Sequence, residues 1–218
     1  MSTESFFKFN EYNTFCISLN TAFERWSRMC HRFDYFQMSI TLWPATKPEN
    51  VLDNCAEYLS PGQRACAQSH MNIWRYIVNK RIPYVLVLED DACLDRNWRD
   101  RLHEFETSRD HWDMLLLNCS EPVEPAYTWT PVKDQYLTGA YLISLNGARK
   151  LVDMFGDKLF AADWMTTRLQ LRGRCYASFP WLVIQEGIDS TIGSGVLADH
   201  AKVLRCLHDC DYTLDNYI

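Results

Sequence analysis

Residues 84–92 read YVLVLEDDA, an apolar run that passes directly into three consecutive carboxylates. A continuous apolar run of this kind is typical of a strand in a parallel sheet whose two faces are both covered. In open α/β sheets, ligands bind beyond the carboxyl ends of the strands. We therefore expect Glu89, Asp90 and Asp91 to project into a crevice at the end of a buried strand.

Strand-like and helix-like patterns alternate on both sides of this stretch. The alternation predicts an α/β fold, with a mainly parallel central sheet flanked by helices. At this length we expect a single domain over 1–218, with a core at about 14–195 and a C-terminal tail at 196–218. Further strands are expected at 14–19, 35–43, 113–118 and 136–144, and helices at 20–33, 60–80, 146–156 and 161–173.

Two of these helices begin with the spacing of a capping box, in which a side chain binds an unpaired amide of the first turn and is bound in return. Ser60 and Gln63 have this spacing, with Pro61 at the first helical position. Thr21 and Glu24 have it as well. Both pairs predict the start of a helix.

The composition argues against several classes of function. The 218 residues are 47% hydrophobic and 23% charged, which is ordinary for a soluble globular protein. A net charge of −6 without basic runs argues against nucleic-acid binding. No segment approaches the roughly twenty apolar residues that span a bilayer, and the first residues lack the features of a signal peptide. The nine cysteines show no repeated spacing, so we expect reduced thiols in a cytoplasmic protein.

The three adjacent carboxylates at 89–91 are best explained by a bound cation. Oxygen ligands suit Mg²⁺ or Mn²⁺, which keep several waters and take further ligands from substrate phosphates. The simpler alternative is a solvated acidic turn that ends the strand. A cation would make this acidic crevice attractive to a diphosphate.

Four segments, taken in order, resemble glycosyltransferase family 25, which holds lipooligosaccharide and procollagen galactosyltransferases. They are ISLNTAFERWSRM (17–29), LSPGQRACAQSH (59–70), YVLVLEDDA (84–92) and TGAYLISLNGARKLV (138–152). The similarity runs from about residue 15 to about residue 192. It departs from the family pattern at Ser18, where Asn is usual, and at Gln63 and Ala65, where Glu and Gly are usual.

The resemblance implies a GT-A type domain that moves a hexose, with inversion, from a nucleotide-diphosphate sugar to a hydroxyl of a glycan or glycoprotein. It implies UDP-glucose or UDP-galactose as donor and Mn²⁺ or Mg²⁺ as cofactor. Residues 89–91 stand where such enzymes carry an Asp-x-Asp metal motif, so Asp91 and Glu89 are the expected metal ligands. The expected donor-binding residues are Ser18, Asn20, Arg25, Glu89, Asp90, Gln185 and Ser190.

Two acids are candidates for the general base. Asp163 opens a predicted helix, where it is either a helix cap or, as the resemblance implies for this segment, a base on the acceptor side. Asp189 is the reserve candidate, within a segment at 181–195 that we expect to close over the donor. Trp164 is expected to pack against the acceptor sugar.

For three histidines an ordinary structural role is the alternative to a role in the site. His70 is expected, with Ser69, to support the site from behind, because a Cys–His pair on this helix lacks an orienting third group. His200 and His208 are either a last metal ligand or ordinary surface histidines.

Two other functions remain as alternatives. One is a catalytically silent module that binds a sugar nucleotide or a glycan and keeps the fold without a working base. The other is a metal-dependent phosphohydrolase, which is disfavoured because the sequence shows no second cluster of His and Asp for a two-metal site.

Overall fold

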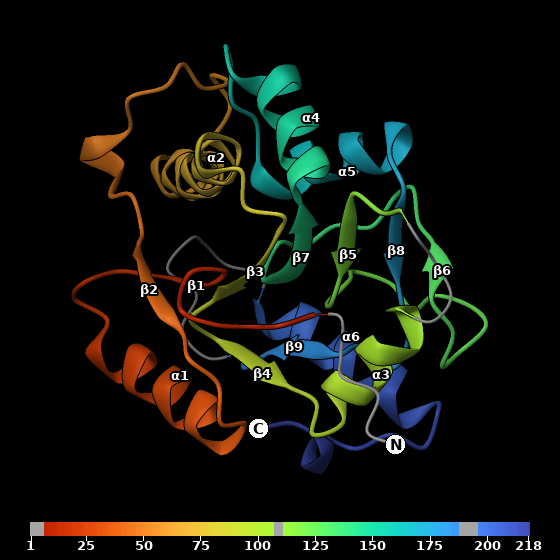
Figure 1. The fold of residues 1–218 in the computed structure, drawn as a ribbon. Helices are drawn as coiled ribbons and strands as arrows, with labels where there is room; N and C mark the ends of the chain where they lie inside the picture. Colours follow the sequence, from red (N-terminus) through yellow and green to blue (C-terminus); the bar gives the residue numbers. More distant parts are fainter. Residues whose placement is uncertain (1–6, 107–110, 188–195) are drawn as a thin grey trace.

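Seven strands form the central sheet of this computed structural model, in which residues 7–106, 111–187 and 196–218 are described (Figure 1). Their order is β2 (Thr41–Pro44), β1 (Thr14–Ser18), β3 (Tyr84–Glu89), β7 (Ala140–Ser144), β5 (Met114–Leu116), β8 (Cys175–Ala177) and β6 (Thr130–Pro131). Strands β7 and β6 run against the other five. The prediction of an α/β fold with a mainly parallel sheet is therefore confirmed.

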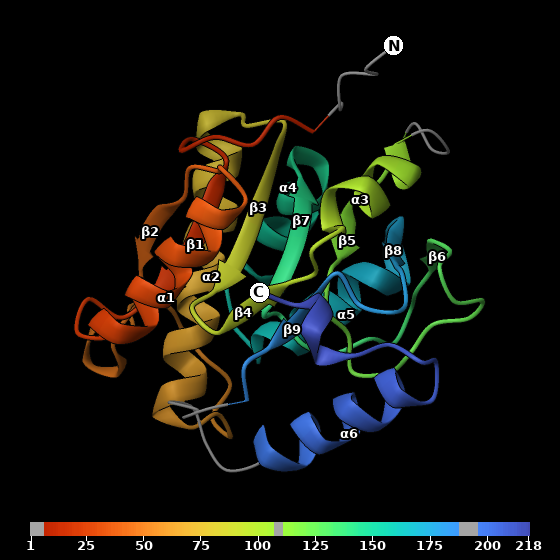
Figure 2. The ribbon, with the colours of Figure 1, turned by 90° about the horizontal axis from the view of Figure 1, so that it is seen from below.

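Helices cover both faces of the sheet (Figure 1). One face carries α2 (Pro61–Lys80), α4 (Leu145–Phe155) and α5 (Ala162–Arg172), and the other carries α1 (Phe23–Tyr35) and α3 (Trp98–Glu106). Short 3₁₀ turns occur at η1 (Pro48–Asn50) and η2 (Leu214–Asn216). Helix α6 (Val196–His208) lies beyond the end of the sheet toward which β3 points (Figure 2).

Strand β3 shows why its sequence is apolar throughout. Val85 and Val87 belong to the core under α2 and α4, whereas Leu86 and Leu88 belong to the core under α1 and α3. All four side chains are fully buried. Alternate residues of a strand point to opposite faces, so a strand covered on both sides has no position for a polar residue until it ends.

The two predicted capping boxes have different outcomes. At α2 the Ser60 hydroxyl accepts from the Gln63 amide at 3.2 Å, and the Gln63 side chain accepts from the Ser60 amide at 2.9 Å. The box predicted for Thr21 and Glu24 is wrong. Helix α1 has Ala22 as its N-cap without a side-chain cap, because the chain first makes a turn closed by the Ala22 amide and the Leu19 carbonyl.

The strand expected at 35–43 is shorter than predicted, because α1 continues to Tyr35 and β2 begins only at Thr41. A second, two-stranded sheet was not predicted. It pairs β4 (Ala92–Leu94) with β9 (Val183–Gln185) in antiparallel register, with Ala92 opposite Gln185. This pairing brings residues 185 and 186 beside the acidic turn, although about ninety residues separate them in the chain.

The segment at 196–218 packs against the core. Leu94 and Ile218 exchange backbone hydrogen bonds of 3.0 and 2.9 Å, and the Tyr217 hydroxyl donates to the Trp181 carbonyl. No helix in the described parts of the chain has both the length and the apolar character needed to cross a membrane.

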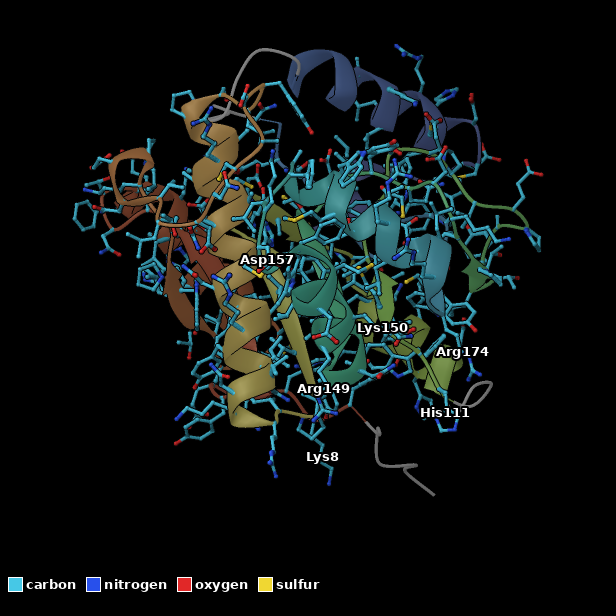
Figure 3. The ribbon with its side chains drawn as sticks, turned by 90° about the horizontal axis from the view of Figure 1, so that it is seen from above. Lys8, His111, Arg149, Lys150, Asp157 and Arg174 are labelled. Atoms are coloured by element: carbon cyan, nitrogen blue, oxygen red, sulfur yellow. The ribbon has the colours of Figure 1, made fainter. Side chains whose placement is uncertain are left out.

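The end of the sheet opposite the carboxyl end of β3 is where β5 begins, and it holds a buried acid, Asp113. Its carboxylate accepts from the Asn146 amide, the Lys150 ammonium and the Arg174 backbone amide at 2.6 to 2.8 Å. A cavity of about 560 Å³ opens there. Figure 3 shows His111, Lys150 and Arg174 gathered at this end.

Candidate active site

The acidic turn lies at the carboxyl end of β3, between the ends of its neighbours in the sheet. β3 ends at Glu89, and β4 begins at Ala92 after the turn through Asp90 and Asp91. The Glu89 amide donates to the Gly139 carbonyl at 2.8 Å, just before β7. The predicted position of the acids at a strand end is thus the observed one.

Gly139 makes close packing possible at this turn. A Cβ atom at this position would lie 2.9 Å from Asn118 Nδ2 and 3.1 Å from Gln185 Cδ. A larger residue here would require the Asn118 or Gln185 side chain to shift, so glycine lets Gln185 approach without such a movement.

Asp90 is compensated by residues from the end of β1 and from α1. Its Oδ2 accepts from the Ser18 hydroxyl at 2.6 Å, and its Oδ1 forms an ion pair with the Arg25 guanidinium. Burial raises the pKa of Asp90, while Ser18 and Arg25 oppose that rise. Arg25 is mostly buried, so it is part of the acidic site and not a solvated surface charge.

Asp91 is far less well compensated. It is only 8% exposed, and its carboxylate oxygens lie 3.4 and 3.5 Å from Gln185 Nε2 and 3.6 Å from Arg25 Nη2. Burial, followed by the nearby charge of Glu89, raises the pKa of Asp91 to about 6. A carboxylate that is costly to ionise in the free protein is one that a bound cation would stabilise.

Glu89 rests against a chain of buried hydrogen bonds. His70 Nε2 lies 3.4 Å from Glu89 Oε1, and His70 Nδ1 lies 2.9 Å from the Tyr141 hydroxyl. The Tyr141 oxygen also accepts from Trp74 Nε1 at 3.0 Å. His70 is therefore held from behind and faces the site through one nitrogen only. The Ser69 hydroxyl accepts from the Thr46 amide at 2.9 Å, and its predicted support role stays a prediction.

Two cavities meet at Glu89. The first, of about 140 Å³, lies between the end of β1 and helix α2, and its lining includes Ser18, Arg25 and Asp90. The second, of about 180 Å³, is lined in part by Asp163 and Gln185. Cys66 and Glu89 line both cavities. The acidic strand end can thus contact two ligands at once, one on each side.

Asp163 reaches the second cavity from the first turn of α5. The N-cap of this helix is Ala161, and no side chain caps it. The Asp163 carboxylate accepts from the next backbone amide, that of Trp164, at 2.7 Å. Asp163 is therefore a first-turn acid that also lines a cavity, and its predicted role as base stays a prediction.

Trp164 belongs to an aromatic cluster beside the site. Its ring centroid lies 4.6 Å from that of Phe160 and 5.8 Å from that of Phe155. The Arg168 guanidinium stacks over the same ring at 4.4 Å. These contacts hold Trp164 in place, and its expected contact with an acceptor sugar stays a prediction.

The remaining predicted residues lie farther out or outside the description. Asn20 is exposed in the turn after β1. His208, at the end of α6, is 91% exposed, 3.9 Å from Asp209. Asp189 and Ser190 fall outside the described residues, as does the side chain of His200.

Three residues near the site, Cys66, Tyr141 and Glu186, have no role predicted from the sequence. Glu186 follows β9 and binds Arg28 and Arg32 of α1 at 3.1 and 3.0 Å. Only the spacing of Cys66 and His70 on one helix could have indicated that the first of these three faces the site. The other two are brought there by strand pairing.

Comparison with known proteins shows the family to which the chain is similar. The sequence model of glycosyltransferase family 25 (LPS biosynthesis protein) matches residues 11–128. Procollagen galactosyltransferase 1-B of Xenopus laevis is 31% identical over 140 residues, covering 59% of this chain and 22% of that protein. The inactive glycosyltransferase 25 family member 3 of Homo sapiens is 33% identical over 105 residues, covering 43% and 18%.

A bacterial relative matches as well. The lipooligosaccharide biosynthesis protein lic2B of Haemophilus influenzae is 27% identical over 92 residues, covering 38% of this chain and 35% of that protein. The chain spans about a fifth of the length of the procollagen galactosyltransferase it matches. Since the family model covers more than half of the 218 residues, the chain belongs to glycosyltransferase family 25.

Proposed function

We propose that this chain is the catalytic domain of a GT-A type glycosyltransferase that moves a hexose from a nucleotide-diphosphate sugar to a hydroxyl of a glycan or glycoprotein. The observation that carries the proposal is the acidic strand end, which stands between two cavities and holds one poorly compensated carboxylate, Asp91. Family membership supports UDP-glucose or UDP-galactose as the donor. An intracellular location stays a prediction from the cysteine pattern.

The residues of the acidic turn fit a hard divalent cation, Mn²⁺ or Mg²⁺. Asp91 and Glu89 would hold it, since Asp90 is engaged by Ser18 and Arg25. Oxygen ligands are the ones such ions prefer, and the contacts that Gln185 and Arg25 make with Asp91 are 3.4 Å or longer, which leaves its carboxylate available to an ion. Such an ion neutralises the charge that develops on a diphosphate leaving group.

The first cavity suits the donor. Arg25 lines it beside Ser18 and Asp90, and its ion pair with Asp90 holds the guanidinium at the cavity wall. A guanidinium held in place in this way can bind phosphate oxygens with little loss of side-chain freedom. Arg25 would therefore bind the diphosphate, and Asp90 and Ser18 would position Arg25.

The second cavity suits the acceptor. Asp163 lines it, on the other side of Glu89 from the first cavity. A carboxylate there could take the proton of an acceptor hydroxyl as that oxygen attacks the anomeric carbon. A base and a leaving group on opposite sides of the reacting carbon are what inversion requires.

A silent binding module is the second candidate, because one of the relatives is described as inactive. A thermal-shift panel of nucleotide sugars, with and without Mn²⁺, tests donor binding, since a ligand of the native state raises the melting temperature. A rise with UDP-glucose or UDP-galactose that needs Mn²⁺ supports the proposal. A rise with guanosine or cytidine sugars and none with uridine sugars overturns the donor assignment.

Turnover then separates an enzyme from a silent module. A glycosyltransferase should slowly hydrolyse its donor with Mn²⁺ in the absence of acceptor, whereas a silent module binds the donor and leaves it intact. The test variant is Asp91→Asn, which should lose the Mn²⁺-dependent stabilisation by donor. The matched control is Asp157→Asn, which changes an exposed acid and should keep that stabilisation.

A further inference from the structure

We propose that Cys66, His70 and Glu89 form a binding site for a transition-metal ion of the Zn²⁺ type, which shares only Glu89 with the hard-cation site expected at Asp91 and Glu89. The Cys66 sulfur, a His70 ring nitrogen and a Glu89 carboxylate oxygen all lie within 4.8 Å of one another. This inference stands on its own geometry and does not depend on the transferase proposal.

The backbone places the three ligands together. Cys66 and His70 are four residues apart on α2, so their side chains share one face of the helix. Glu89 ends β3 opposite that face. The 3.4 Å between His70 Nε2 and Glu89 Oε1 matches the roughly 3.4 Å between nitrogen and oxygen ligands of a tetrahedral zinc ion with bonds of about 2.1 Å. The Cys66 sulfur lies within 4.8 Å of both atoms and would move closer when the ion binds.

The chemistry of the three ligands favours zinc over manganese or magnesium. Thiolate and imidazole are ligands of Zn²⁺, whereas Mg²⁺ and Mn²⁺ prefer oxygen. Three protein ligands with a fourth position open are typical of zinc sites that bind a water or a substrate. Cys66 and Glu89 line both cavities, so a water or a substrate in either cavity could occupy the fourth position.

The surroundings of His70 resemble the outer shell that metal sites require. A histidine ligand is usually oriented by a hydrogen bond from its other nitrogen. His70 Nδ1 lies 2.9 Å from the Tyr141 hydroxyl, which is itself held by Trp74 Nε1. The Tyr141 oxygen has two lone pairs and can accept from both Trp74 and His70 when Nε2 binds a metal.

Cobalt titration of the metal-stripped protein tests the site, because Co²⁺ bound to a thiolate gives a sulfur-to-metal charge-transfer band. We expect this band in the wild-type protein and its loss on adding one equivalent of Zn²⁺. It should be absent from Cys66→Ser and Cys66→Ala, with folding of each checked by circular dichroism. The matched control is Cys93→Ser, which removes a partly buried thiol beside the same acidic turn and should keep the band.

Two further variants sharpen the test. Tyr141→Phe should weaken Co²⁺ binding by roughly tenfold to a hundredfold while keeping the band, as loss of an outer-shell partner does. Asp91→Asn should keep the band even though it is expected to lose Mn²⁺-dependent donor binding, so failure of the two proposals can be told apart. A wild-type protein without the band, or a band that survives in both Cys66 variants, would overturn the site.

Discussion

Each end of the sheet holds a buried acid, and the two acids differ in how closely hydrogen-bond donors surround them. Asp113, where β5 begins, is 2% exposed and accepts from three donors within 2.8 Å. Asp91, beyond the end of β3, is 8% exposed and has contacts of 3.4 Å or longer from Gln185 and Arg25. Burial is similar at both ends, and only the compensation differs. A buried acid with full compensation serves the fold, whereas one with poor compensation is available to a ligand.

The packing around the two acids agrees with this contrast. Gly147 and Gly173 leave room for Asp113, since a Cβ atom at either position would lie within 2.7 Å of an Asp113 oxygen. Asp91 instead lies beside Gln185, which lines a cavity. A nearby cavity does not distinguish the two acids, because Asp113 lines the cavity of about 560 Å³ at its own end of the sheet, so the contrast lies in their hydrogen-bond partners.

The largest expected effect concerns a third acid, Asp163, which lines a cavity. If it is the general base, Asp163→Asn should lower transfer by roughly a hundredfold to ten-thousandfold, because a positioned base contributes that much. Donor binding should be nearly unchanged, since amide and carboxylate have the same shape. The measurement is transfer at saturating donor and Mn²⁺, with Asp157→Asn as control. Near-normal transfer would move the base to Asp189 or to another residue.

The next effect is on stability and concerns Asp113. Asp113→Asn should lower the free energy of unfolding by about 2 to 3 kcal/mol, because it removes charge-assisted hydrogen bonds from a buried carboxylate. Lys150 is partly exposed and can regain water, which limits the loss. Urea unfolding at neutral pH measures the change. A loss no larger than that of the exposed control Asp157→Asn would show that Asp113 is not the structural acid described above.

A smaller effect is the pH dependence of the metal-free protein. The folded-state pKa of Asp91, about 6, is above its ordinary value of 3.8, so folding is opposed once this group ionises. The contribution of Asp91 to the free energy of unfolding is fully present below about pH 4 and is lost as the pH rises through 6. Wild type should therefore lose on the order of 1 to 3 kcal/mol relative to Asp91→Asn between pH 4 and 7.

This pH dependence is best measured by urea unfolding in the presence of a chelator. The difference between wild type and Asp91→Asn isolates the one group from all other carboxylates. A constant difference from pH 4 to 7 would contradict the raised pKa. Added Mn²⁺ should reduce the loss if Asp91 is a ligand.

The smallest effect tests Asp90, the compensated member of the turn. Ser18→Ala removes its 2.6 Å hydrogen bond, so the pKa of Asp90 should rise further and stability at pH 7 should fall by about 1 kcal/mol. Thermal unfolding at pH 7 and at pH 4 measures this. The loss should be smaller at pH 4, and an equal loss at both values would mean that the hydroxyl serves packing instead of the charge.

Much of the framework could be predicted from local sequence. The YVLVL run predicted a strand buried on both faces, and the Ser60 and Gln63 pair predicted the start of α2. Both predictions rest on a pattern of adjacent residues, which a sequence displays directly. Two predictions of this local type are wrong. The capping box at Thr21 does not form because a turn precedes the helix, and the strand expected at 35–43 is shorter because α1 extends to Tyr35.

The position of the acids at a strand end and the class of the sheet follow from the order of residues along the chain. Which acid is compensated depends on the folded arrangement of distant segments. Ser18 and Asp90 are 72 residues apart, and Gln185 and Asp91 are 94 apart. The charge state of a buried carboxylate depends on burial and on partners within a few ångströms, and pairing of distant strands supplies both. The contrast between Asp91 and Asp113 could not be predicted from residues that are adjacent in the chain.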